Sequence, residues 1–241
     1  MCFTVNVNIV KEELESRYGS RLLDPEKYRP SYYYHAFSYP DLPVSCLDDN
    51  KERQLSVFKW GLIPSWVSNF EEAERIRKMT PNARCETLAD KPSFSESFER
   101  RRCLVPVAGF FEWQDLGSYK RPWYIHSPDS NIISLAGIYD RWYDKQNDQD
   151  LHTFSILTTK ANTSMARIHN KKERMPVIIP EGNEDKWLFG KPGEIEDFFK
   201  PPDDNMLIYH TVSPVLGKKD IEKNRPEIIK PYTYPEEPTL F

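Results

Sequence analysis

The sequence is poor in glycine and cysteine and has no long apolar run. It contains 9 glycines against 20 prolines, which indicates many rigid turns and edge strands rather than disorder. Its 4 cysteines form no Cys-x-x-Cys or Cys-x-x-His pair, so the sequence predicts free thiols in a reducing compartment and no zinc site. No stretch reaches the ~18 apolar residues of a membrane-spanning helix. We therefore expect a globular protein without a metal, a cofactor or a membrane partner.

An excess of positive charge is also absent. The formal net charge is −4, which argues against a protein that coats nucleic acid by bulk charge. Any nucleic-acid contact must come from a local basic patch. The start of the chain has no basic segment, long apolar segment or lipidation motif, so we expect a cytoplasmic protein that joins the nucleoid when it binds DNA.

Residues 3–9 alternate strictly between apolar and polar side chains, which predicts a half-buried strand. The core face is expected to consist of Phe3, Val5, Val7 and Ile9. The polar face is expected to consist of Cys2, Thr4, Asn6 and Asn8. This pattern predicts that the Cys2 thiol opens onto a cleft.

The remaining pattern predicts one α+β domain over residues 1–241, with a largely antiparallel, barrel-like sheet and short peripheral helices. Strands are predicted at 55–63, 102–113, 122–127, 131–142, 151–159, 175–179 and 206–213. Helices are predicted at 11–18, 69–79, 183–189 and 194–199, with another that Asn162 or Thr163 caps and that ends near His169. Residues 31–44 are interpreted as an ordered aromatic loop, and the tail from about 218 as a less regular segment.

Cys2 carries the most distinctive chemistry. Initiator methionine is usually removed when residue 2 is small, and removal here leaves an N-terminal cysteine with an amine and a thiol on neighbouring carbons. The reference pKa of an α-amine is about 7.7–8.0, so part of it is neutral at pH 7. Such an amine condenses with an aldehyde to an imine, and the thiol can then close a thiazolidine ring. For a cysteine taken alone, the default interpretation is an incidental or buried residue, and it is the position after Met1 that favours the chemical role.

Asn82, Arg84 and Glu86 occupy alternate positions in the segment Asn-Ala-Arg-Cys-Glu-Thr. If this segment is extended, the three side chains share one face. That face could form the polar floor of a binding site, in which Arg84 would be free to bind phosphate. The alternative is a surface strand that carries an Arg84–Glu86 ion pair.

Two further motifs carry titratable groups. Glu112 lies in Gly-Phe-Phe-Glu-Trp. Its aromatic neighbours can desolvate the carboxylate and raise its pKa toward the range in which a carboxyl group transfers protons near neutral pH. His169 ends a predicted helix and can act as acid or base. Lys171, Lys172 and Arg174 supply positive charge beside it. The alternatives are an outward-facing glutamate, a structural histidine and a solvated basic loop; His210 is interpreted as structural or supporting.

The segment Trp-Gly-Leu-Ile-Pro-Ser-Trp holds two tryptophans. Trp60 ends a predicted strand and is assigned to the core. Trp66 follows the proline turn and is the better candidate for stacking on a nucleobase, which contributes ~1–3 kcal/mol per base.

In their order along the chain, these motifs resemble the SOS-response-associated peptidase (SRAP) family. The resemblance rests on the Met-Cys start, on segments 60–66, 82–87 and 109–113, and on residues 169–179. It spans residues 1 to about 217 and implies a monomeric single domain around a distorted β-barrel. The chain departs from the family pattern at Phe3 and Thr4, where the family usually has Gly-Arg, and in a longer interval between His169 and Arg174.

The resemblance implies a protein that binds single-stranded DNA and crosslinks to abasic sites through its N-terminal cysteine. The residues implied to be catalytic are Cys2, Asn82, Glu112 and His169. The residues implied to contact DNA are Arg84, Trp66 and Arg174. A crosslink through an imine also admits lyase behaviour.

Two other functions fit the same residues. In a cysteine peptidase that also processes its own N-terminus, Cys2 would be the nucleophile and His169 the base, with Asn82 or Glu112 orienting the histidine. A non-catalytic module would bind single strands without any covalent product and would keep this binding after Cys2→Ala.

Overall fold

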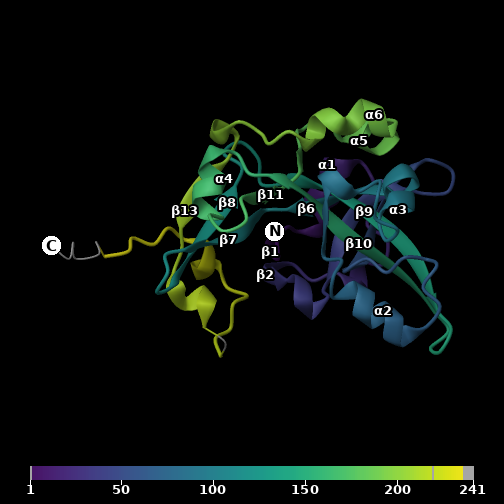
Figure 1. Ribbon diagram of the computed structural model, residues 1–241, viewed down its shortest axis with the longest axis horizontal. Coiled ribbons are helices and arrows are strands. Elements are labelled where there is room, and N and C mark those ends of the chain that lie inside the picture. Colours follow the sequence, from purple (N-terminus) through teal and green to yellow (C-terminus); the bar gives the residue numbers. More distant parts are fainter. Residues whose placement is uncertain (1, 219, 236–241) are drawn as a thin grey trace.

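Five strands close into a ring in the computed structural model, which describes residues 2–218 and 220–235. Around the ring they follow the order β10 (Gln149–Lys160), β4 (Arg53–Trp60), β3 (Asp41–Leu47), β6 (Arg102–Val107) and β9 (Ile133–Asp144). Strand β9 pairs again with β10 and so closes the barrel. Only the β10–β4 pair in this ring is parallel. The predicted α+β domain with a largely antiparallel, barrel-like sheet is confirmed (Figure 1).

A second, fully antiparallel sheet stands beside the barrel. Its order is β13 (Ile208–Thr211), β8 (Lys120–His126), β7 (Gly109–Asp115), β1 (Thr4–Val7) and β2 (Ser31–His35). The chain passes from the barrel to this sheet at Ala108, between β6 and β7. The single strand predicted at 102–113 is therefore wrong, because its two halves pair with different neighbours.

Most of residues 31–44 form strand rather than the predicted loop, because β2 and β3 are separated only by a 3-10 turn, Ala36–Ser38, and two further residues. Strand β2 reads Ser-Tyr-Tyr-Tyr-His, and aromatic side chains are favoured on a pleated surface. Pro43 lies within β3 opposite Val57 of β4. Strand β6 pairs with β3 only at Ser45 and Cys46, so the missing proline N–H costs no ladder bond to β6.

The helices are short and lie at the periphery. They are α1 (Lys11–Tyr18), α2 (Phe70–Arg77), α3 (Ser95–Arg100), α4 (Thr163–Ile168), α5 (Glu184–Phe189) and α6 (Pro192–Ile195). Gly19 ends α1 with φ 64° at the predicted boundary, and the side chain of Asn162, one of the two predicted candidates, caps α4. The predicted strand at 175–179 splits into β11 (Arg174–Pro176) and β12 (Ile178–Ile179). No helix in the described ranges is long and apolar enough to span a bilayer.

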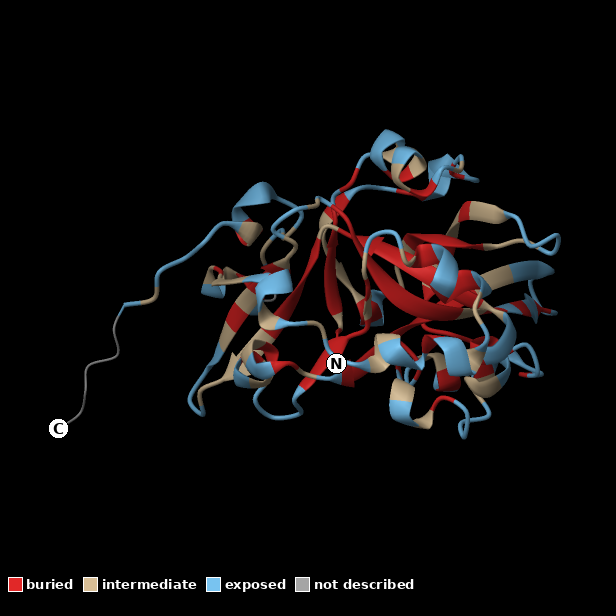
Figure 2. Ribbon diagram, turned by 90° about the horizontal axis from the view of Figure 1, so that it is seen from above, coloured by how far each residue is buried: buried red, intermediate tan, exposed pale blue. Residues whose placement is uncertain are grey.

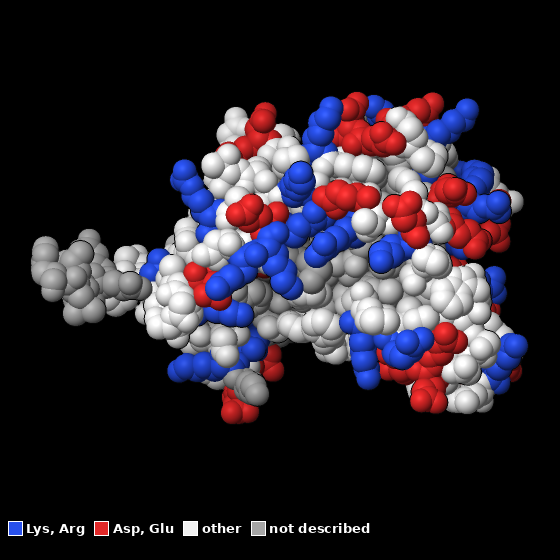
Figure 3. All heavy atoms as spheres, in the orientation of Figure 1, with Lys and Arg blue, Asp and Glu red and all other residues white. Residues whose placement is uncertain are grey.

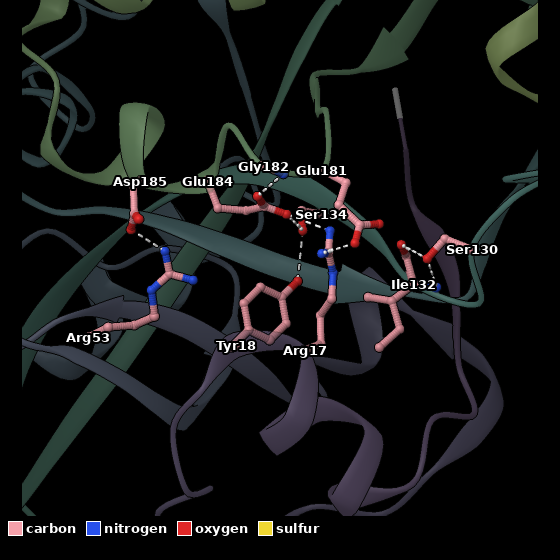
Figure 4. A network of polar contacts seen from close by, with 10 residues as sticks. All are labelled: Arg17, Tyr18, Arg53, Ser130, Ile132, Ser134, Glu181, Gly182, Glu184 and Asp185. Atoms are coloured by element: carbon pink, nitrogen blue, oxygen red, sulfur yellow. Dashed lines mark hydrogen bonds and ion pairs between the residues drawn. The ribbon is translucent and has the colours of Figure 1, made fainter.

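Helix α1 is fastened to the barrel by a polar network (Figure 4). The Tyr18 hydroxyl and the Ser134 hydroxyl of β9 lie 2.8 Å apart. Arg17 forms ion pairs with Glu181 at 2.7 Å and with Glu184 at 2.5 Å. The segment that follows β1 is thereby held at a fixed place, and this also fixes where the N-terminal strand enters the sheet.

Both faces of β1 are buried, which corrects the prediction of one polar face open to a cleft. Cys2, Thr4 and Asn6 are 0–1% exposed, and only Asn8 is exposed. Strand β1 is paired on both edges, with β2 and β7. Its polar face is covered as well, because Asn6 donates a 2.8 Å hydrogen bond to the Tyr124 hydroxyl within a second apolar cluster that includes Leu216. Figure 2 shows the strands beside the N-terminus as buried.

Candidate active site

The fold brings Cys2 next to Asn82, although these residues are far apart in the sequence. The Asn82 side-chain amide donates a 2.9 Å hydrogen bond to the Cys2 carbonyl oxygen. Asn82 begins β5 (Asn82–Arg84), which pairs in parallel with β10 and is therefore fixed by the barrel. Asn82 is 8% exposed, so this hydrogen bond lies inside the protein.

Glu112 and His169 form a second pair at the same place. Glu112 projects from β7 and its Oε2 lies 4.0 Å from His169 Nε2. His169 is the residue at which α4 ends. Its Nδ1 lies 2.9 Å from the Arg174 carbonyl oxygen, a contact that directs Nε2 toward the carboxyl group. The imidazole is thus oriented from one side and faces a carboxyl group on the other.

Burial sets the protonation of this cluster. It raises the pKa of Glu112 to about 7 and lowers the pKa of His169 to about 4. At neutral pH the imidazole is therefore uncharged and the carboxyl group exchanges readily between its two forms. Burial also raises the pKa of the Cys2 thiol, so the sulfur is protonated at rest. The cluster can hold and transfer a proton, but it does not favour a resting thiolate.

A pocket of about 430 Å³ opens beside these groups. Glu112 and His169 line it together with Phe3 and Thr4, the two residues that follow Cys2. Leu216 and Gly217, near the C-terminus, form another part of its wall. Cys2 itself has no exposed surface and is not among the lining residues, whereas Phe3 and Thr4, which follow it in the chain, are.

Arg84 and Arg174 occupy different environments. Arg84 is exposed and makes no ion pair within residues 2–218 and 220–235. The predicted extended segment ends at Arg84, because Glu86 lies in a 3-10 turn, Cys85–Thr87. Glu86 pairs with Arg174 rather than Arg84, at 2.5 and 2.9 Å. Arg174 is only 8% exposed, so its guanidinium is a buried support and not an open phosphate site.

The two tryptophans separate as predicted. Trp60 is fully buried, and its indole N–H donates to the Pro81 carbonyl at 2.8 Å. Trp66 is 51% exposed on the turn that follows β4. Its ring is available for stacking, but its indole N–H donates to the Pro92 carbonyl at 3.4 Å and not to a member of the Cys2 cluster.

The pocket also contains residues that the sequence did not single out as site residues. Tyr33 and His35 of β2, Trp113 of β7 and Lys120 of β8 all line it. The run of aromatic residues at 31–35 could have indicated that a strand lines the site. The interpretation of this segment as a loop hid that possibility. Across the described part of the chain, no group of three or more His, Cys, Asp or Glu side chains is placed to hold a metal ion.

The structure is an α+β domain with a five-stranded barrel and a flanking sheet, and it places Cys2 beside the buried carboxyl group of Glu112 and the half-buried imidazole of His169. The family described as SOS response associated peptidase (SRAP) matches residues 1–219, and the chain belongs to that family.

Several relatives are similar over most of the chain. An abasic site processing protein of Bacillus subtilis, YoqW, is 35% identical over 214 residues, which cover 85% of this chain and 90% of the relative. The abasic site processing protein HMCES of Xenopus tropicalis is 31% identical over 231 residues, covering 85% and 67%. A crystal structure of a Bacteroides thetaiotaomicron protein superimposes with a TM-score of 0.89 at 38% identity, covering 96% of this chain and all of that one.

Proposed function

We propose that this protein captures abasic sites in single-stranded DNA as a covalent adduct of Cys2, after Met1 has been removed. Its relatives are named abasic site processing proteins, and an abasic deoxyribose in its open form carries an aldehyde. The single observation that carries the proposal is the position of Cys2, held by Asn82 and beside Glu112 and His169.

The proposed reaction has two bond-forming steps. The neutral amine of Cys2 attacks the aldehyde carbon to give a carbinolamine, which loses its hydroxyl group as water and becomes an imine. The Cys2 sulfur then adds to the imine carbon, and the thiol proton ends on the nitrogen. The product is a thiazolidine, and the overall change is the loss of one water. No oxidant or metal is consumed.

Glu112 and His169 fit the proton transfers of this reaction. A carboxyl group with a pKa of about 7 can give a proton to the departing hydroxyl group and take one back. The neutral imidazole can accept the proton that the attacking amine or the thiol releases. Because the thiol rests in its protonated form, we place the attack of the amine before that of the sulfur.

Asn82 is placed to hold the reacting residue. Its amide nitrogen holds the Cys2 carbonyl, whereas its Oδ1 is buried and makes no hydrogen bond within the described residues. A buried acceptor without a donor is uncommon. In the proposal, Asn82 holds both the N-terminus and the reacting sugar, and the amine set free by Met1 removal supplies a donor for Oδ1.

DNA contacts are proposed for the exposed side chains at some distance from the reacting atoms. Arg84 follows Asn82 by two residues in β5 and is free to meet a phosphate. Trp66 offers an exposed ring for stacking. For Arg174 the contacts favour a supporting role, because it binds Glu86 and its backbone carbonyl orients His169.

A cysteine peptidase remains the second candidate, favoured by the family description and by the position of Cys2 near Glu112, which in turn faces His169. Its nucleophile would be a thiolate, whereas burial raises the pKa of the Cys2 thiol. We therefore expect no turnover of peptides supplied in trans. Measuring the cleavage of a peptide library at neutral pH distinguishes this candidate from the crosslinking reaction.

The test uses a single-stranded oligonucleotide in which a glycosylase has converted one uracil into an abasic site. The protein is expected to give a shifted band that survives denaturation. Cys2→Ala should abolish this band, whereas Cys85→Ala, which changes a half-buried cysteine outside the cluster, should retain it. A band that persists in Cys2→Ala would refute the proposal, and unchanged binding without any covalent product would identify a simple binding module.

A further inference from the structure

The loop Asn170–Glu173, between α4 and β11, is held against the end of β7. The Asn170 amide donates a 2.8 Å hydrogen bond to the Asp115 carbonyl, and the Asp115 N–H donates to Asn170 Oδ1 at 3.0 Å. The loop therefore starts next to His169 and is anchored three residues beyond Glu112. Its position is fixed relative to both proton-transfer groups.

Two lysines of this loop, Lys171 and Lys172, line the pocket together with Lys120 of β8. Lys171 is 70% exposed and has a loose ion pair with Asp115 at 3.8 Å. Within the described ranges, neither Lys120 nor Lys172 has a carboxylate at ion-pair distance, and the Lys172 charge acts on Glu112 from farther away. Phe3 and Thr4, on the neighbouring wall, carry no charge. The positive charge around this pocket thus comes mainly from the loop Asn170–Glu173 and from the start of β8.

Several cations elsewhere on the molecule are paired more closely, whereas others, such as Arg84, also make no ion pair among the described residues. Arg77 lies 2.8 Å from Glu74, Lys59 lies 2.9 Å from Asp41, and Arg141 lies 2.5 Å from Asp150. Figure 3 shows lysine and arginine side chains crossing the face in front of β7 and β11. On a chain with a net charge of −4, cations left without partners beside a pocket indicate an anionic ligand.

We propose that Lys171 and Lys172, with Lys120 opposite, form a subsite for a backbone phosphate adjacent to the reacting sugar. The inference rests on the proposed function and adds to it a binding element for the strand. Lysines suit this role because an ammonium group binds phosphate as a point charge without demanding one geometry. The anchored loop would place that phosphate at a set distance from Glu112 and His169, and so position the aldehyde for attack.

Lys172 should also affect the pH dependence of the reaction, which a lysine in a fully solvated loop would not do. Burial raises the pKa of Glu112 to about 7, and the Lys172 charge is among the groups that oppose this rise. Removing the Lys172 charge should therefore move the pH dependence of the reaction upward, even when the DNA is saturating. A lysine that never faces the site would leave that dependence unchanged.

The experiment measures non-covalent binding to a single-stranded oligonucleotide with one tetrahydrofuran residue, an abasic analogue that has no aldehyde. We compare the parent protein with Lys171→Ala/Lys172→Ala, with the double arginine variant and with Lys27→Ala/Lys145→Ala. The last variant removes the same charge on surfaces remote from the pocket, including the tip of the β9–β10 hairpin (Figure 1). Midpoints of thermal unfolding check that all four proteins are folded.

The alanine variant of the loop is expected to bind about tenfold more weakly at moderate salt. Its slope of log affinity against log salt should fall by about 0.7 for each phosphate that the protein no longer neutralises. The arginine variant and the remote control should keep both values. Equal affinity and slope in the alanine variant overturn the subsite while leaving the crosslinking proposal intact. An absence of binding by the parent protein overturns both, so the two failures are distinguishable.

Discussion

The side-chain amide of Asn82 holds the carbonyl oxygen of Cys2 at 2.9 Å, inside the protein and at the junction of the barrel with the second sheet. This hydrogen bond joins the segment before β1 to β5, and it fixes the residue to which the proposal assigns the reaction. Both elements must be in place before the site exists. The position of Cys2 therefore depends on contacts between parts of the chain that are far apart in the sequence.

Replacing Asn82 tests this hydrogen bond. Asn82→Ala removes a buried interaction whose loss typically costs about 1–3 kcal/mol, so the single-turnover rate of crosslinking should fall about 10- to 100-fold. Asn82→Asp should do no better, because a carboxylate offers no donor to the Cys2 carbonyl. The rate is followed on denaturing gels with saturating DNA. Parental rates in both variants would show that Asn82 does not position Cys2.

The pH dependence of the rate tests Glu112. In the proposed reaction the carboxyl group, with a pKa of about 7, acts in its protonated form, and the Cys2 amine, with a reference pKa of about 7.7–8.0, acts in its neutral form. The rate should therefore rise with pH as the amine loses its proton, and fall at higher pH as Glu112 loses its own. In Glu112→Gln the alkaline fall should vanish and the maximum should drop by roughly 100-fold. A variant that keeps the fall at high pH would assign it to another group.

Cys2→Ser separates the roles of amine and sulfur. A serine at this position is also small enough for methionine removal, and it retains the amine that forms the imine. The variant should give no band that survives denaturation on its own. Borohydride, which reduces an imine to a stable amine, should restore a band. A stable adduct of Cys2→Ser without borohydride would contradict ring closure by sulfur.

Gly109 provides a prediction of stability rather than activity. A Cβ at this position would lie 2.5 Å from the Tyr124 ring and 2.6 Å from the Ile125 carbonyl oxygen. Gly109→Ala should destabilise the fold by about 2 kcal/mol and lower Tm by roughly 4–8 °C. Gly193→Ala is the matched control, because nothing lies within 4 Å of its added Cβ. Equal Tm values for the two variants would contradict this packing argument.

Much of the fold was accessible from the sequence because its signals are local. The left-handed Gly19 ends α1 and Asn162 caps α4, and both are decided within a few residues. The assignment of Trp60 to the core and Trp66 to the surface followed from their places around Pro64. The desolvated Glu112 was also indicated by its aromatic neighbours in the chain.

The sequence predictions that failed depend on contacts between residues that are far apart in the chain. Alternation along β1 predicted one exposed face, but the second face is covered by residues more than a hundred positions away, including Tyr124. The division of 102–113 at Ala108 depends on which strands lie on either side. Glu86 pairs with the distant Arg174 and not with Arg84, the alternative partner that the spacing offered, because Cys85 begins a turn that redirects the chain.

Intact-mass spectrometry of the protein after incubation with the abasic oligonucleotide tests the central claim most directly. The account predicts one adduct, whose mass equals the protein without Met1 plus the oligonucleotide minus one water, and whose modified peptide begins at Cys2. A protein that retains Met1 should give no adduct, because its Cys2 nitrogen is an amide. An adduct on the Met1-containing form, or on any residue other than Cys2, would contradict the account.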